Sequence, residues 1–345
     1  MGYDDNTLRQ LSGYRLASSN ATYESRWRLF ESYCDARRID PFHASPATIS
    51  NFLTHLASFR GASVSTLAGY RTAIGHVVRL VTGFDPGCDA LLSQLMKSFR
   101  RTQPVSAMRV PEWDVTLVLN TLLSASCADD ALSLHTITAK AVFLLALASG
   151  ERRHALAALA SPPTFEVGSV TLRFHQGFIP KSYFLRTNLT RIGPLHIPAC
   201  PPHLRQVCPV ATLRAYVDRV APMRRSTQTS LFIPHDTTNT NNISVQSVGR
   251  YLVHLIRFCY QSVDSTLPPC RAHDVRKVAA ALRALTTVAL DAVLDAGQWS
   301  SPHTFLQYYN VPLRRLTQTD MRRFTGLSVG RSTFSLQAEE SRPSE

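Results

Sequence analysis

Apolar residues in the first third of the chain recur at the three- and four-residue steps of amphipathic helices. The pattern predicts four helices between residues 20 and 101, the last of which ends near the segment LLSQLMKSFRR. Ser45 and Ser63 stand immediately before the second and third helices, and we expect them to be the N-caps. The positions that carry the pattern are Tyr23, Trp27, Phe30, Cys34, Ile49, Phe52, Leu53, Leu56, Leu67, Ile74, Val77, Val78 and Val81. This part of the chain is therefore predicted to be a helical bundle.

Two prolines interrupt the helical pattern that precedes them. Pro104 and Pro111 lie in the basic segment TQPVSAMRVPEW, residues 102–113, which predicts a linker between domains. A length of 345 residues also suggests two domains, at roughly 150 residues each. We expect the chain to comprise an N-terminal extension at 1–19, a helical domain at 20–101, the linker at 102–113, a second domain at 114–325 and a polar, flexible tail at 326–345.

The second domain mixes helical and strand-like patterns. Short runs rich in β-formers stand at VTLRF (170–174), GFIP (177–180) and PLHIP (194–198), with turn residues between them. Helices are predicted at 114–126, 133–149, 209–221, 244–262, 272–284 and 288–296. The expected fold class is mainly α (α+β), with a helical bundle followed by a mostly helical domain that carries a small antiparallel sheet.

The charge points to a polyanionic partner. The chain has 37 basic and 24 acidic residues, a net charge of +13 and an isoelectric point near 9.8. Lysine occurs only at positions 97, 140, 181 and 277, so 33 of the 37 basic residues are arginine. The planar fork of arginine matches phosphate geometry, although a GC-rich genome would produce the same bias.

The cysteines and the apolar runs exclude several classes of protein. Seven scattered cysteines form no CxxC pair, so neither a disulfide framework nor a zinc site is indicated. The first residues contain no apolar signal, and no run of about 18 apolar residues occurs, so we expect no membrane association. An intracellular location follows, in the nucleus of a eukaryotic host and otherwise in the cytoplasm or nucleoid.

Two segments in the first half of the second domain carry residues suited to phosphate chemistry. Arg152 stands just after Gly150, which ends a very apolar helix, and its guanidinium could hold a phosphate oxygen. A surface arginine that caps the helix is an equally good interpretation of Arg152 alone. Lys181 lies between two strand-like runs, where an ammonium group could protonate a departing oxygen, but a single exposed lysine is usually only solvated.

Two further segments lie near the end of the second domain. His273 and Arg276 are three residues apart at the start of a predicted helix, so both can address one anion. Trp299 could donate its indole hydrogen to a phosphate oxygen, and the adjacent Tyr308 and Tyr309 follow it within one short helix. A tyrosine has a pKa of about 10, so a phenol needs nearby cations to act as a nucleophile.

In this order and at these separations, the four segments resemble the tyrosine recombinase, or phage integrase, family. The segments RAHDVR and WSSPHTFLQYY resemble most closely the recombinases of DIRS-type tyrosine-recombinase retrotransposons. The resemblance extends to residues 20–101, which look like the helical core-binding domain of that family. It implies DNA strand cleavage and rejoining through a 3′-phosphotyrosyl bond, as in the integration or recombination of a mobile element, without metal or cofactor. The implied partners are double-stranded DNA and further copies of the chain, four at a synapse.

Roles are carried over position by position. The resemblance implies Arg152 and Arg276 as the phosphate clamp, Lys181 as the general acid, His273 as an acid/base partner and Trp299 at the second His/Trp position.

The nucleophile is left open between two neighbours. A spacing of nine from Trp299 selects Tyr308, whereas a ThrPhe-x-x-x-Tyr pattern at a spacing of ten selects Tyr309. Neighbours on a helix point about 100° apart, so only one of them can face the phosphate. We choose Tyr309, with Tyr308 as the alternative.

The chain also departs from the family pattern. Ala155 stands where an acidic residue is frequent, and Lys277 stands where histidine is frequent, which puts the rate in doubt more than the mechanism. Two other functions therefore remain open: a DNA-binding protein that keeps the fold without catalysis, and a nicking enzyme like the type IB topoisomerases.

Overall fold

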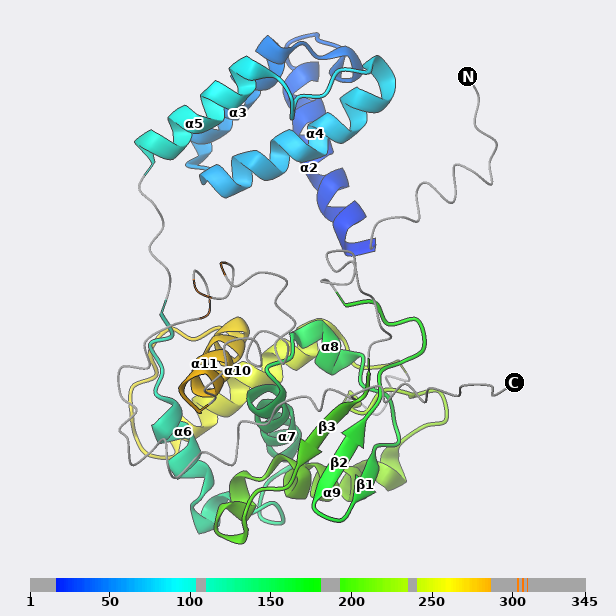
Figure 1. Cartoon of the computed structure of the whole chain (residues 1–345), viewed down its shortest axis with the longest axis vertical. Coiled ribbons are helices and arrows are strands. Elements are labelled where there is room, and N and C mark those ends of the chain that lie inside the picture. The colour runs from blue at the N-terminus through cyan, green and yellow to red at the C-terminus, as the bar shows by residue number, and fades with distance from the viewer. Residues whose placement is uncertain are drawn as a thin grey trace, which may run out of the picture. The chain divides into compact units, whose positions relative to one another are not determined.

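The computed structural model describes residues 17–103, 110–180, 193–234 and 241–286, together with the single positions 303, 306 and 309. The chain divides into two compact units, Met1–Ala107 and Met108–Glu345 (Figure 1). Each unit is built around its own apolar core. The prediction of a mainly helical fold with a small antiparallel sheet is confirmed.

The first unit is a bundle of helices, as the apolar pattern predicts. Its elements are α2 (Ala17–Asp35), the short 3-10 helix η1 (Pro41–His43), α3 (Pro46–Arg60), α4 (Val64–Thr82) and α5 (Ala90–Thr102). Both predicted N-caps are confirmed, since the Ser45 hydroxyl accepts from the Thr48 N–H at 3.2 Å and the Ser63 hydroxyl accepts from the Thr66 N–H at 3.3 Å. Each cap satisfies one N–H that the first helical turn leaves without an intrahelical partner.

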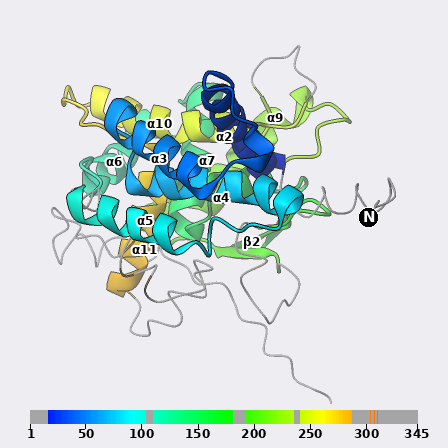
Figure 2. The same cartoon turned by 90° about the horizontal axis from the view of Figure 1, so that it is seen from above.

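Helix α4 lies at the centre of this bundle, in contact with α2, α3 and α5 (Figure 2). Phe30, Phe52 and Leu67 are fully buried or nearly so in the shared core. One predicted core position is wrong: Val81 is 48% exposed, because it belongs to the last turn of α4, which ends at the left-handed Gly83.

The second unit contains further helices around a three-stranded sheet. In chain order its elements are α6 (Val115–Leu122), η2 (Ala125–Cys127), α7 (Leu134–Ser149), α8 (Arg153–Ala157), β1 (Thr164–Glu166), β2 (Ser169–Leu172), β3 (Leu195–Pro198), η4 (Pro202–Val207), α9 (Pro209–Val220), η5 (Ala221–Met223), α10 (Val245–Gln261) and α11 (Ala272–Thr286). The predicted helix 288–296 and the tail 326–345 lie outside the described residues.

Helix α7 is the central element of the second unit. Every residue from Thr136 to Ser149 is buried, and α7 contacts α8, α9, α10, α11 and β3. A helix that is apolar on all sides must be surrounded by other elements, which explains this position. The surrounding elements therefore hold the C-terminal end of α7 in place, and they fix the position of the turn that follows it.

The sheet has the order β1-β2-β3, with antiparallel pairs throughout. Val170 on β2 pairs with Ile197 on β3, and both side chains are buried. The strand predicted at GFIP is wrong: Gly177 has a φ of 81°, which closes a turn, and Phe178 stacks on Phe174 with the ring centroids 4.8 Å apart. The first strand of the sheet is instead Thr164–Glu166.

The helix predicted at 114–126 is shorter than expected. Helix α6 ends at Leu122, and the Ser124 hydroxyl donates to the Thr121 carbonyl at 2.6 Å, which competes with continuation of the helix. Before this helix, Trp113 is only 3% exposed and belongs to the core of the second unit, although we expected it in the linker.

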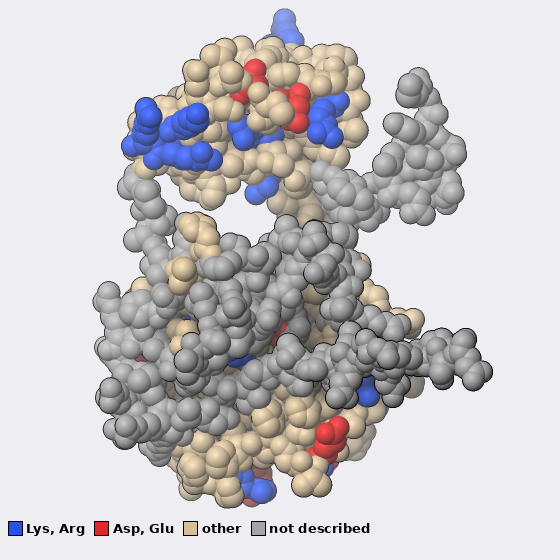
Figure 3. Space-filling model, viewed as in Figure 1, with Lys and Arg blue, Asp and Glu red and all other residues tan. Residues whose placement is uncertain are grey.

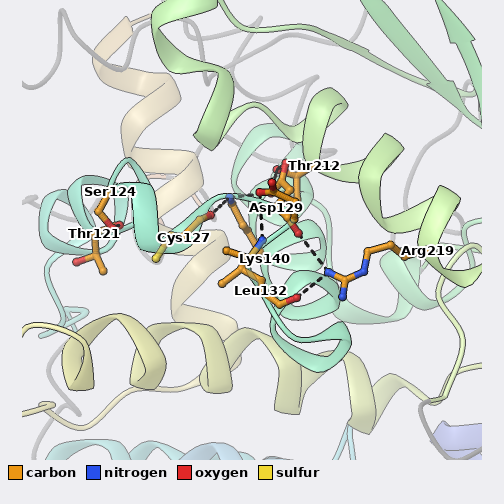
Figure 4. A network of polar contacts seen from close by, with 10 residues as sticks. Thr121, Ser124, Cys127, Asp129, Leu132, Lys140, Thr212 and Arg219 are labelled. Atoms are coloured by element: carbon orange, nitrogen blue, oxygen red, sulfur yellow. Dashed lines mark hydrogen bonds and ion pairs between the residues drawn. The ribbon is translucent and has the colours of Figure 1, made fainter.

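A network of polar contacts around one ion pair connects α7 to the loop before it and to α9 (Figure 4). Lys140 is fully buried, and its ammonium donates to the Cys127 carbonyl at 2.7 Å and to the Asp129 carboxylate at 2.8 Å. The same carboxylate accepts from the Thr212 hydroxyl at 3.2 Å, while Arg219 donates to the Leu132 carbonyl at 2.6 Å. These contacts give the buried Lys140 ammonium a counter-charge and satisfy polar groups of the loop before α7. An unpaired charge at this position would be costly.

Candidate active site

The turn after α7 presents Arg152. Gly150 caps the helix with a φ of 66°, a left-handed conformation that glycine adopts without steric cost, and its N–H donates to the Ala146 carbonyl. The Ser149 hydroxyl donates to the Leu145 carbonyl and accepts from the Glu151 N–H, which fixes the next peptide. Arg152 then occupies the N-cap position of α8 and is partly exposed. The buried helix α7 is thus followed, three residues after its end, by an arginine that is partly exposed.

The start of α11 is held by its own capping contact. The Asp274 carboxylate, which is 2% exposed, accepts from the Arg271 N–H at 2.9 Å, as the acidic residue of a capping box does. His273 remains exposed, whereas Arg276 is 3% exposed. One Arg276 Nη donates to the Gly150 carbonyl, so the helix that carries His273 is tied to the turn that carries Arg152.

A second arginine on α11 makes a similar contact. Arg283 follows Arg276 by seven residues, so both project from the same side of the helix. Arg283 is 4% exposed and donates to the Ala148 carbonyl at 2.7 Å. Arg283 was not among the predicted site residues, although an arginine at two-turn spacing from Arg276 inside the apolar run VAAALRAL is a signal for it.

Tyr309 lies against His273 and Arg276, the two predicted site residues on α11. It is 8% exposed, and its hydroxyl oxygen is 3.4 Å from Nε2 of His273. The two rings meet edge to face, with centroids 5.9 Å apart and an interplanar angle of 67°. The guanidinium carbon of Arg276 lies 5.5 Å from the centroid of the tyrosine ring, within the range of a cation–π contact.

Positive charge dominates the electrostatics around this tyrosine. The pKa of His273 is lowered from its ordinary 6.5, first because neighbouring groups displace water from around part of the otherwise exposed imidazole, and then by the charges of Arg276, Lys277 and Arg152. Burial lowers the pKa of Arg276 to about 10, with a further contribution from Arg152 and an opposing one from Glu151. At neutral pH the imidazole is therefore neutral, while the arginine keeps its charge.

Four predicted residues thus gather at one place, and we call Arg152, His273, Arg276 and Tyr309 the site cluster. Glu151, 6% exposed and close enough to affect the pKa of Arg276, is a buried carboxylate that was not among the predicted site residues. Lys181, Trp299 and Tyr308 lie outside the described residues.

The site cluster has the properties of an anion site with a nucleophile beside it. Two guanidinium groups offer several N–H donors to an oxyanion, and a phenol stands next to a neutral imidazole that can accept its proton. Within the residues that the structure describes, no three His, Cys, Asp or Glu side chains gather as a metal ion would require. Nor does any helix in those residues combine the length and apolar character needed to cross a bilayer.

Comparison with known proteins finds similarity in structure only. No family model and no curated protein matches the chain. Among solved structures, the chain is similar to a lambda integrase dimer bound to a COC′ core site, with 12% identity, coverage of 91% of this chain and 96% of that chain, and a TM-score of 0.52.

Two other solved structures show the same likeness. Tn1549 transposon integrase in complex with circular intermediate DNA has 14% identity, coverage of 92% and 96%, and a TM-score of 0.54. The XerH site-specific recombinase bound to a palindromic difH substrate has 13% identity, coverage of 76% and 67%, and a TM-score of 0.50. Similarity at this level of identity concerns architecture, and the architecture of this chain is the tyrosine recombinase fold.

Proposed function

We propose that the protein cleaves and rejoins DNA strands as a site-specific tyrosine recombinase, through a 3′-phosphotyrosyl intermediate. The observation that carries this proposal is the position of Tyr309, whose hydroxyl lies 3.4 Å from the His273 imidazole while Arg276 lies over its ring. A phenol beside a base and two arginines is the arrangement that nucleophilic attack on a phosphodiester needs.

The roles follow from the chemistry of the groups. Arg152 and Arg276 bind the non-bridging oxygens of the scissile phosphate and offset the charge that develops in the transition state. The Tyr309 oxygen attacks phosphorus as its proton passes to neutral His273, and the bond to the 5′ oxygen breaks. Lys181 protonates that leaving oxygen, and Trp299 donates a hydrogen bond to the phosphate.

Reversal of the same step completes the exchange. A 5′ hydroxyl from another strand attacks the phosphotyrosyl phosphorus, which restores both a phosphodiester and the free phenol. The energy of the broken bond is retained in the covalent intermediate, so rejoining draws on no nucleotide.

The charge of the first unit supports DNA as the partner. Lys97, Arg100 and Arg101 are exposed on the last two turns of α5, and Figure 3 shows basic side chains gathered over that end of the helix. Such a group suits phosphates of a duplex independently of base sequence. The solved structures that the chain resembles include complexes with DNA. We extend the proposal to a mobile element of the DIRS type as the source of the chain, and to four protomers at the synapse.

A covalent adduct is the direct test of this function. The full-length protein is incubated with a pool of randomised duplexes that carry a nick near the middle of one strand, so that a released fragment cannot return. The proposal predicts a protein–DNA adduct that survives denaturation and yields a phosphotyrosyl peptide by mass spectrometry. Binding without any adduct would instead identify a non-catalytic DNA-binding protein. Adducts accompanied by relaxation of any supercoiled plasmid, without strand exchange, would identify a topoisomerase-like enzyme.

A further inference from the structure

Two cysteines meet where the chain enters α9. Cys200 follows strand β3, and Cys208 occupies the N-cap position of the helix. The six residues of η4 fold the chain back between them, and the Cys200 N–H donates to Sγ of Cys208 at 3.2 Å. The two thiols also interact with each other, which raises the pKa of Cys200 and lowers that of Cys208. All seven cysteines are free thiols, so this contact is a reduced pair.

The pair borders an open cleft of about 960 Å³. Cys200, Cys208, Arg205 and Arg214 are among its lining residues. Cys200 is partly exposed, whereas Cys208 is only 3% exposed, so the sulfur of Cys208 is within reach of small reagents alone. The site cluster does not use either residue.

The pKa values of the two thiols are shifted in opposite directions. The pKa of Cys208 is lowered to about 6, first by the hydrogen bond from the Cys200 thiol and then by neighbouring backbone N–H groups. The pKa of Cys200 is raised, because its proton is held by Cys208 and because it is partly buried. One sulfur is therefore a thiolate at neutral pH, and its neighbour keeps a proton.

We propose that Cys200 and Cys208 form a modification site for hydroperoxides, at which Cys208 is oxidised and Cys200 then closes a disulfide with it. The Cys208 thiolate attacks the terminal oxygen of the hydroperoxide, the O–O bond breaks, and an alcohol or water leaves with a proton from solvent. The sulfur becomes a sulfenic acid as the peroxide is reduced. Cys200 then attacks that sulfur, an S–S bond forms, the S–O bond breaks, and the Cys200 proton leaves with the hydroxyl as water.

A second pair of cysteines supplies a matched control within the same unit. Cys127 and Cys259 are 1% and 0% exposed, and Cys127 lies close enough to affect the pKa of Cys259. Burial raises the pKa of Cys259, and Cys127 adds to the effect. The Cys259 thiol therefore keeps its proton and both sulfurs are shielded from solvent, so we expect the pair to resist the oxidant that closes the first one.

Peptide mapping of the full-length protein tests the proposal. The protein is treated with hydrogen peroxide, blocked with N-ethylmaleimide under denaturing conditions and digested with trypsin without reduction. Cleavage after Arg191, Arg205 and Arg214 separates Cys200 and Cys208, so only a disulfide can join peptides 192–205 and 206–214. We expect this joined pair, lost on reduction, while Cys127 and Cys259 are recovered as alkylated thiols. Recovery of Cys200 and Cys208 as alkylated thiols after other cysteines have oxidised would overturn the proposal.

Single substitutions test the order of the steps. In Cys200→Ser, dimedone should label Cys208 as a trapped sulfenic acid, and in Cys208→Ser the label at Cys200 should be absent. Labelling of Cys200 in the second variant, with Cys208 unlabelled in the first, would contradict the assignment of Cys208 as the reactive sulfur. Thermal unfolding of each variant shows that the fold is kept, and the mapping of the unsubstituted protein stands whether or not the variants fold.

Discussion

The hydroxyl of Tyr309 lies 3.4 Å from Nε2 of His273, although 36 residues separate the two in the chain. The contact links Tyr309 to the core of the second unit, because His273 is fixed by the start of α11 and α11 is tied through Arg276 to the turn after α7. The Tyr309 hydroxyl thus lies beside a neutral imidazole, and the buried Arg276 guanidinium lies near its ring.

His273 is predicted to titrate below its ordinary pKa of 6.5 in the folded protein. The unfolded chain then binds a proton in a pH window where the native protein does not, so this residue lowers stability as the pH falls through 6.5 and has no effect above the window. NMR titration of the imidazole measures the pKa. Lys277→Gln should raise it, since the Lys277 charge opposes protonation. A pKa at or above 6.5 in the unsubstituted protein would contradict the described electrostatics.

Arg276→Lys is predicted to keep DNA binding and to lower the rate of cleavage by about 100-fold or more. Lysine keeps the charge but lacks the fork that can donate to the Gly150 carbonyl and to a phosphate together. The rate of adduct formation on the nicked duplexes is the measurement. Arg250→Lys, a change on the exposed side of α10, is the control and should cleave at the normal rate. Equal rates for the two variants would remove Arg276 from the mechanism.

Long periodic segments were the most predictable part of this fold. Helices α4 and α10 each extend over several turns of regular apolar spacing; α4 begins directly after the predicted N-cap Ser63, and α10 lies within one residue of its predicted bounds. The short elements α8 and β1 were not predicted, because five and three residues are too few to show a period. Helix α8 packs on α10, which lies far along the chain, and β1 forms by pairing with β2.

Site residues that belong to a short sequence motif could be predicted, whereas residues whose role depends on a contact with a distant part of the chain could not. His273 and Arg276 could be found from their spacing and Arg152 from the glycine before it. The spacing of Arg283 from Arg276 singles out the residue, but its contact could not be assigned, because the acceptor is a carbonyl on α7 that only the folded chain brings near. Spacing also left Tyr308 and Tyr309 as alternatives, whereas the contact with His273 supports the choice of Tyr309.

Asp129→Asn is predicted to destabilise the protein by about 3 kcal/mol, because it leaves the fully buried Lys140 ammonium without its counter-charge. Thr212→Val removes only one neutral hydroxyl donor to the same carboxylate and should cost about 1 kcal/mol. Urea unfolding measures both free energies. If the two substitutions were equally costly, the ion pair would not be the dominant contact in this network.

Replacement of Lys97, Arg100 and Arg101 by glutamine is predicted to weaken DNA binding and to reduce its dependence on salt. Each lost phosphate contact lowers the slope of log affinity against log salt by about 0.9, so the slope should fall by about 2 to 3. Arg28→Gln is the control, since the Arg28 guanidinium is already paired with the Glu24 carboxylate. An unchanged slope in the triple variant would show that this end of α5 does not contact phosphates.

The most direct test compares two single substitutions, Tyr309→Phe and Tyr308→Phe, in the covalent adduct assay with nicked duplexes. Both variants remove one hydroxyl from adjacent positions, so differences in binding and folding should be small. We predict that Tyr309→Phe binds DNA but forms no adduct, while Tyr308→Phe still forms it. Adducts that persist in Tyr309→Phe and disappear in Tyr308→Phe would contradict the assignment of Tyr309 as the nucleophile.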